Sequence, residues 1–152
     1  GSKALTVFIS YSHVDEELKN ALLKHLEPLK RLKLVEAWHD RKLKAGDDID
    51  HEISAKLAKS DIALFLISVD FINSSYCYDV ELEKALELHA KGKLTVIPVI
   101  LRSCLWQRTP LAKLVALPKD GKAIMASPDR DEAFTDVAEG LRIKALEILD
   151  NR

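Results

Sequence analysis

The residue with the clearest chemical potential is a glutamate on the apolar side of a predicted helix. The sequence predicts a helix from Cys77 to Lys91, and at about 100° per residue its side chains separate into two arcs. The polar arc holds Asp79, Glu83, Lys84, Glu87 and Lys91. The opposite arc holds Cys77, Tyr78, Leu82, Ala85, Leu86 and Leu88, and Glu81 falls inside it. A carboxylate is costly there unless it is paired, hydrogen-bonded or at the lip of a cleft, so Glu81 is a candidate functional residue.

Glu81 also has a purely structural interpretation. Lys84 stands three residues further along the same helix, at a spacing where opposite charges pair on a helix surface. Without knowledge of what surrounds the helix, a Glu81–Lys84 ion pair on its shoulder explains the carboxylate as well as a catalytic role does.

Composition excludes several functional classes. The 152 residues fit one domain, which we expect to span residues 3–150, with Gly1-Ser2 as a cloning remnant. Lys and Arg (23) nearly balance Asp and Glu (24), so no overall charge draws the chain to nucleic acid or to an anionic membrane. The longest apolar run, Leu94 to Leu101, is far too short to span a bilayer. Two cysteines without a spacing pattern indicate a reducing compartment, and we expect a cytoplasmic protein.

Strand and helix patterns alternate along the chain. Short apolar, β-branched runs predict strands at Leu5–Ser10, Leu34–Trp38, Ile62–Ile67 and Leu94–Leu101, with a weak fifth at Ala123–Ala126. Helical periodicity predicts helices from Asp15 to about Leu32, from Asp48 through Leu57, from Cys77 to Lys91, and from Asp131 to about Leu149. Ser12 and Asp15 have capping-box spacing, and His39 to Asp47 is expected to form a polar loop. Pro98 removes a ladder hydrogen bond from the fourth strand, which a short or absent neighbour would allow.

Alternation of this kind predicts the fold and the place of the site. Right-handed crossovers produce a parallel sheet with helices on both faces, and we expect a single flavodoxin-like α/β domain with five strands in the order 2-1-3-4-5. Its ligand crevice lies beyond the carboxyl ends of strands 1 and 3. These ends are Ser10-Tyr11-Ser12 and Ser68-Val69-Asp70, and the second leads directly into the helix of Glu81.

Several known chemistries lack their residues. None of the five glycines forms a Gly-x-Gly-x-x-Gly dinucleotide clamp, and there is no phosphate-loop motif. Receiver domains of this fold need an acidic pair after strand 1 and a lysine after strand 5, and neither is present. The five histidines are scattered, so we expect no metal site.

Three motifs are spread along the chain: Phe8-Ile9-Ser10-Tyr11-Ser12, then Asp40-Arg41-x-Leu43-x-x-Gly46-Asp47, then Ser68-x-Asp70-Phe71 followed by Ser75-Tyr76-Cys77 and Glu81. Together they resemble the signature regions of Toll/interleukin-1 receptor (TIR) domains, the last in the form found in bacterial, enzymatic members. Val96-Ile97-Pro98-Val99, Trp106 and Leu117-Pro118 also fit bacterial TIR chains. Tyr76 stands where tryptophan is usual, Ala45 where many members have proline, and the third-box Phe-Trp is not evident.

The resemblance implies an NAD⁺ glycohydrolase with no resident cofactor. Nicotinamide is a cationic leaving group, so the enzyme has mainly to stabilise an oxocarbenium-like ribosyl transition state. One carboxylate, Glu81, can do this electrostatically. The expected substrate-binding residues are Ser10, Tyr11, Ser12, Trp38, Asp40, Ser68, Tyr76 and Cys77, with the aromatic rings as stacking platforms. Activation by self-assembly is expected through a loop containing Arg41, Leu43 and Gly46. The products would be nicotinamide and ADP-ribose or a cyclic isomer.

Alternatives remain open for individual residues and for the whole domain. Ser12 can be a helix cap, Trp38 can belong to the core, and Cys77 can be a small buried filler. The resemblance also fits a non-catalytic scaffold that signals through TIR–TIR contacts. In either case we expect the domain to be an effector of a bacterial defence or virulence protein, fused to a sensor domain.

Overall fold

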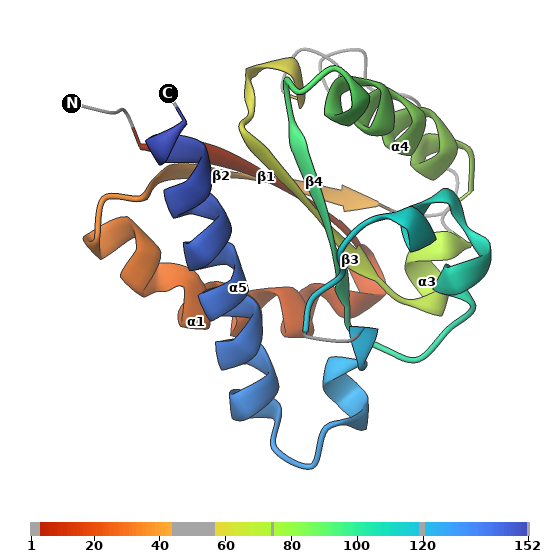
Figure 1. Ribbon diagram of the computed structural model, residues 1–152. Helices are drawn as coiled ribbons and strands as arrows, with labels where there is room; N and C mark the ends of the chain where they lie inside the picture. Colours follow the sequence, from red (N-terminus) through yellow and green to blue (C-terminus); the bar gives the residue numbers. More distant parts are fainter. Residues whose placement is uncertain (1–3, 44–56, 74, 119–120, 152) are drawn as a thin grey trace.

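The computed structural model describes residues 4–43, 57–73, 75–118 and 121–151, and for residues 37, 39–43, 75–81 and 110 it describes the backbone only. These residues form a four-stranded parallel sheet flanked by helices (Figure 1). The strands are β1 (Leu5–Ser12), β2 (Val35–Leu43), β3 (Ile62–Ile67) and β4 (Thr95–Ile100), in the order β2-β1-β3-β4. The expected α/β fold and the order of the first four strands are confirmed.

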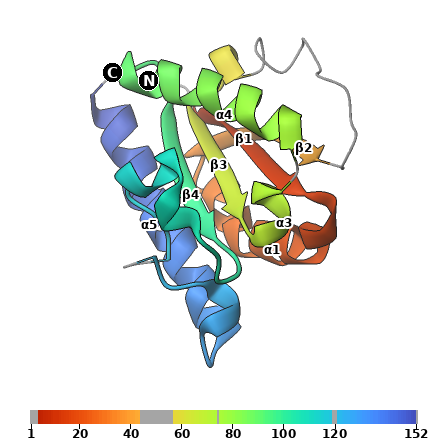
Figure 2. The same cartoon turned by 90° about the vertical axis from the view of Figure 1, so that its right-hand side faces the viewer.

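Helices cover the two faces of the sheet. On one face lie α1 (Glu16–Arg31) and α5 (Arg130–Asp150), and on the other lies α4 (Ser75–Ala90), preceded by the short helix α3 (Val69–Ile72) (Figures 1 and 2). None of the helices in the described ranges is long and apolar enough to cross a membrane.

Each face of the sheet carries its own apolar cluster, because successive strand side chains point to opposite sides. In β1, Val7, Ile9 and Tyr11 pack against α1 and α5, in what we call the α1/α5 cluster. Phe8 packs on the other side with Phe65 of β3 and with Leu82 and Ala85 of α4, in the α4 cluster.

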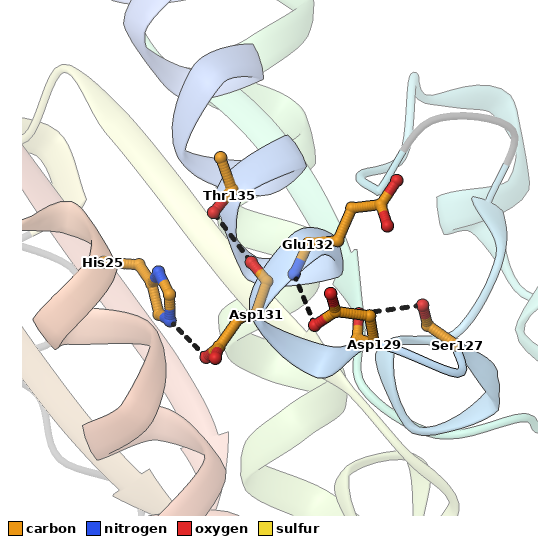
Figure 3. A network of polar contacts seen from close by, with 6 residues as sticks. All are labelled: His25, Ser127, Asp129, Asp131, Glu132 and Thr135. Carbon is orange, nitrogen blue, oxygen red and sulfur yellow. Dashed lines mark hydrogen bonds and ion pairs between the residues drawn. The ribbon is translucent and has the colours of Figure 1, made fainter.

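The contact between α1 and α5 is reinforced by polar groups at the start of α5 (Figure 3). Asp129 caps the helix by accepting a hydrogen bond from the amide of Glu132 at 3.2 Å. His25 of α1 contacts Asp131 at 3.3 Å, and its ring stacks on Phe134 with centroids 5.2 Å apart. These contacts fix where α5 begins relative to α1.

The expected fifth strand is wrong. Ala123 to Ala126 does not form a strand, and Ile124–Ala126 is a 3-10 turn with Ile124 fully buried. The edge of β4 is instead closed by Leu117, whose amide donates to the carbonyl of Pro98 and whose carbonyl accepts from the amide of Ile100, both at 2.8 Å. A short apolar run can be buried as a turn as well as a strand, and here a single bridging residue occupies the position beside β4.

The same bridge explains why Pro98 is tolerated inside β4. The nitrogen and carbonyl of one strand residue point to the same side, so the nitrogen of Pro98 faces the edge that Leu117 covers and not β3. No hydrogen bond to β3 is lost, and the expectation of a short neighbour on that side is confirmed.

The second strand is longer than expected. It continues from Val35 to Leu43, so the first half of the expected His39–Asp47 loop is strand. Asp40 and Arg41 are in register with Ile9 and Ser10 of β1. Their polar side chains resemble a loop in sequence, but pairing with the long, apolar β1 extends the strand. Gly46 and most of the helix expected from Asp48 lie outside the described residues, although residues 57–59 are helical.

Candidate functional site

The carboxyl end of β1 places two of the three candidate serines on the side of the sheet that α4 covers. Phe8 belongs to the α4 cluster and Tyr11 to the α1/α5 cluster. By the alternation of strand side chains, Ser10 and Ser12 therefore face the same side as Phe8. Both serines are buried. The predicted site and the helix of Glu81 thus lie on one side of the sheet.

Ser68 connects the end of β3 to the end of β1. Its hydroxyl donates to Oδ2 of Asp15 at 2.5 Å and accepts from the amide of Phe71 at 3.1 Å, which caps α3. Asp15 and Ser68 are both 0% exposed. A hydrogen bond to a buried carboxylate in this geometry is stronger than one between neutral groups.

The spacing of Asp15 to Ser12 suggested that Asp15 caps the following helix, but the structure shows no such cap. Residues His13–Asp15 form a 3-10 turn before α1, and the side chain of Asp15 makes no capping hydrogen bond. Its carboxylate is directed into the protein, toward β3 and β4. The sequence pattern of a capping box is local, and a long-range partner has displaced it here.

Arg102 supplies the charge opposite Asp15. It follows β4 by two residues, and its Nη2 lies 3.1 Å from Oδ1 of Asp15. Nη1 lies 4.0 Å from Oδ2 of Asp70 in α3. The Arg102 and Asp70 side chains are 40% and 39% exposed, whereas that of Asp15 is fully buried. The pair with Asp15 is a close charge contact without the alignment of a hydrogen bond, since Oδ1 has no hydrogen-bond partner in the described part of the chain.

Sequence reasoning missed Arg102 and gave Asp15 a different role. A signal was present for Arg102: it follows a predicted strand and so must lie at the carboxyl edge, where the candidate serines end their own strands. Nothing local marks Asp15, because its partners are separated from it by 53 residues or more in the chain.

Ser10 and Ser12 differ in how their hydroxyls are used. The Ser12 hydroxyl accepts from the amide of Val14 at 3.4 Å, so it is a cap, as the structural alternative held. The hydroxyl of Ser10 is buried and has no hydrogen-bond partner among the described residues. A buried unsatisfied hydroxyl is uncommon in proteins and calls for an explanation.

The structure places two of the expected ring platforms in or against the core. Tyr11 is only 3% exposed, and Lys19 of α1 lies 5.0 Å from the centre of its ring. Trp38 is half-buried against the α1/α5 cluster, on the opposite side of the sheet from α4. Both rings therefore pack in or against the core, because odd-numbered positions of β1 and the paired position of β2 face α1 and α5.

The helix of Glu81 has the orientation that its sequence predicts. Leu82, Ala85 and Leu88 are buried, while Glu83 and Glu87 are exposed. Glu81, Tyr76 and Cys77 lie in α4, but their side chains are outside the described part of the structure, as are those of Asp40, Arg41 and Leu43. Their roles, and the Glu81–Lys84 pairing, remain predictions.

The surroundings of Glu87 in α4 and of Cys104 in the loop after β4 shift the pKa values of these two groups. Lys91 donates to Glu87 at 3.0 Å, and this bond, together with the positive charges of Lys91 and Lys84, lowers the pKa of the Glu87 carboxyl. Burial raises the pKa of the Cys104 thiol. Cys104 is therefore held as a neutral thiol near pH 7, which argues against a nucleophilic role.

The hollows found among the described residues do not coincide with this edge. One of about 500 Å³ lies between residues 118–128 and α5, near Glu132, Asp136 and Glu139. Another of about 400 Å³ lies between β4, residues 113–117 and α5. Neither hollow is lined by the convergent polar groups Ser10, Asp15, Ser68 and Arg102. We place the candidate site at the carboxyl edge because these polar groups meet there and because ligands bind at that edge in sheets of this topology. Within the described ranges, no group of three or more His, Cys, Asp or Glu side chains could hold a metal ion.

Comparisons with known proteins agree with this architecture. A family model of the TIR domain matches residues 7–141. The uncharacterized protein y4lF of Sinorhizobium fredii is 50% identical over 137 residues, which are 90% of this chain and 42% of that protein. The disease resistance-like protein DSC1 of Arabidopsis thaliana is 29% identical over 101 residues, 66% of this chain and 8% of that protein. The chain thus spans less than half the length of these relatives.

A solved structure has the same fold. The TIR domains of the activated Roq1 resistosome, which directly recognizes the pathogen effector XopQ, superpose with a TM-score of 0.58 at 17% identity. The match covers 91% of this chain and 99% of that one. Because the family model spans most of the sheet and helices described above, the chain belongs to the TIR domain family.

Proposed function

We propose that this TIR domain cleaves NAD⁺ between nicotinamide and ribose, with Glu81 as the catalytic carboxylate. The observation that carries the proposal is the buried Ser10 hydroxyl, which has no hydrogen-bond partner among the described residues and faces the side of the sheet covered by α4. It lies at the carboxyl end of β1, where ligands bind in sheets of this kind. A hydroxyl that no described protein group satisfies there is suited to a polar group of a substrate.

The chemistry needs few protein groups. The C1′–N bond of the ribosyl pyridinium breaks, and its electron pair goes to the ring nitrogen, so that nicotinamide leaves as a neutral molecule without protonation. The ribosyl cation is then attacked by water, which loses a proton and gives ADP-ribose, or by a group of the same molecule, which gives a cyclic isomer. A carboxylate beside the ribose stabilises the cation electrostatically.

The test is nicotinamide release by the purified domain at high concentration, followed by chromatography. Glu81→Gln keeps the size of the side chain and removes its charge, so we expect the rate to fall by about 10²–10³. The melting temperature should be unchanged or higher, because the substitution removes a charge from the apolar arc that the sequence predicts for this helix. Glu83→Gln is the matched control, since Glu83 is exposed on the same helix. If Glu81→Gln retains more than about a tenth of the wild-type rate, a barrier change of under about 1.4 kcal/mol, Glu81 is not the catalytic residue.

A non-catalytic scaffold is the second candidate, and the likeness to TIR domains of a resistosome favours self-association in either case. We propose that assembly uses the segment that contains Asp40, Arg41, Leu43 and Gly46. Nicotinamide release should then rise more steeply than in proportion to protein concentration. A rate strictly proportional to concentration over a wide dilution series, from a protein that light scattering shows to be monomeric, would contradict activation by assembly. A scaffold would self-associate without releasing nicotinamide.

The length of the relatives also bears on the rest of the full-length protein. Because the relatives are longer than this chain, we propose a separate sensor domain that triggers the TIR domain in a bacterial defence or virulence protein of the cytoplasm. No resident cofactor is needed for the proposed reaction, in which NAD⁺ is the substrate.

A further inference from the structure

Three strand ends are joined at the candidate site by one chain of polar contacts. Arg102, after β4, contacts Asp15, after β1, with Nη2 at 3.1 Å from Oδ1. The other carboxylate oxygen of Asp15 accepts from Ser68, after β3, at 2.5 Å. The amide of Arg102 also donates to the carbonyl of Ile67, the last residue of β3, at 3.4 Å.

The chain of contacts ends on the helix that leads into α4. The Ser68 hydroxyl accepts from the amide of Phe71, which lies in α3. Phe71 is fully buried and packs in the α4 cluster with Leu82 and Ala85. α3 contacts α4 and ends at Ile72, three residues before α4 begins at Ser75. Ser68 is therefore linked, through Phe71 and α3, to the beginning of the helix that carries Glu81.

Stability alone does not explain these charges. Moving the Asp15 carboxylate out of water is costly, and apolar side chains of similar volume can replace a buried ion pair without loss of stability. A network of this kind defines a geometry, because each hydrogen bond and ion pair restricts the orientation of its partners. Here the network involves α3 and, through it, the start of α4, which is the helix that carries Glu81.

We propose that Arg102 is a positioning residue that holds α3 and the start of α4 in place through Asp15 and Ser68, an inference that rests on the proposed cleavage of NAD⁺. Arg102 contacts Asp15 through Nη2, and its Nη1 lies 4.0 Å from Oδ2 of Asp70 in α3. The contact with Asp15 uses one nitrogen, so it requires a positive charge and not the forked shape of a guanidinium. It acts on turnover by fixing where Glu81 stands.

The experiment compares five proteins: wild type, Arg102→Met, Arg102→Lys, the double variant Asp15→Asn with Arg102→Met, and Arg108→Met. Arg108 is an exposed arginine without a described ion pair and serves as the control. For each we measure kcat and KM for nicotinamide release, the melting temperature, and hydrogen exchange at the amide of Phe71. The double variant removes both charges together, and its new amide oxygen can still accept from Ser68, so no unpaired charge is left buried.

The double variant should fold and remain impaired. We expect its melting temperature to be close to that of wild type while kcat falls by about tenfold or more and KM changes by less than about threefold. Arg102→Lys should recover most of kcat, and Arg108→Met should resemble wild type. Wild-type kcat in the double variant would show that only charge compensation matters and would overturn the proposal. An equal effect of Arg102→Met and Arg108→Met would also overturn it.

The exchange measurement separates this inference from the proposed function. If wild type releases no nicotinamide, the proposed function fails, and the Phe71 amide still reports on the position of α3. Its exchange should accelerate by about tenfold or more in the double variant and in Arg102→Met, and not in Arg108→Met. Unchanged exchange in the double variant would overturn the positioning role whatever the activity is.

Discussion

Ser68 and Ser10 are both fully buried serines at the carboxyl edge of the sheet, and we expect them to respond to alanine in opposite ways. The Ser68 hydroxyl makes two hydrogen bonds, to Asp15 at 2.5 Å and from Phe71 at 3.1 Å. The Ser10 hydroxyl has no partner among the described residues. The two substitutions delete the same atom, so any difference between them measures the hydrogen bonds.

The expected cost of Ser68→Ala follows from these two bonds. A hydrogen bond to a charged group contributes about 1.5–3 kcal/mol net, and the loss of a helix cap costs about 1 kcal/mol. The free energy of unfolding should therefore fall by about 2–4 kcal/mol. In a domain of this size the melting temperature should fall by roughly 4–16 °C. Ser10→Ala removes a hydroxyl that no described protein group satisfies, so stability should stay within about 0.5 kcal/mol or rise.

Urea unfolding followed by circular dichroism measures both variants, provided that the dependence on urea concentration is the same as in wild type. A loss of stability in Ser10→Ala as large as that in Ser68→Ala would refute the hydrogen-bond assignment. Nicotinamide release adds a second comparison. If the Ser10 hydroxyl binds substrate, Ser10→Ala should fold normally and turn over NAD⁺ more slowly, whereas unchanged turnover would remove Ser10 from the proposed site.

Two further predictions concern the loops. Gly121 has φ +69°, and an added Cβ would lie 2.8 Å from the Trp106 ring, whereas Gly92 has φ +72° and open space around it. Gly121→Ala should therefore lower the free energy of unfolding by about 1–3 kcal/mol and Gly92→Ala by less; equal losses in urea unfolding would show that the Trp106 contact does not matter. Burial raises the pKa of the Cys104 thiol. We therefore expect its alkylation rate, measured in a Cys77→Ser variant, to rise only at pH values above those at which an ordinary thiol becomes reactive. Alkylation with an ordinary midpoint, in a protein that circular dichroism shows to be folded, would contradict this.

Local sequence patterns were sufficient to predict much of the architecture. The apolar runs at β1, β3 and β4 appear in the structure where the patterns place them, as do the buried and exposed sides of residues 82–88 in α4. Their order in a parallel sheet follows from right-handed crossovers between consecutive strands. The position of the candidate site at one edge of the sheet follows from the same rule, because parallel strands end together.

The contacts that make up the site required the tertiary structure. The sequence treats Ser10 and Ser68 alike and assigns Asp15 to a local cap, whereas its carboxylate is paired with groups from the ends of β3 and β4. The length of β2 and the replacement of a fifth strand by Leu117 depend on which neighbour is available for hydrogen bonding. Periodicity reports which face of an element is buried, but the partner of a polar group is chosen by residues far away in the chain. Which of the two hydroxyls has a hydrogen-bond partner among the described residues was therefore decided only by the folded protein.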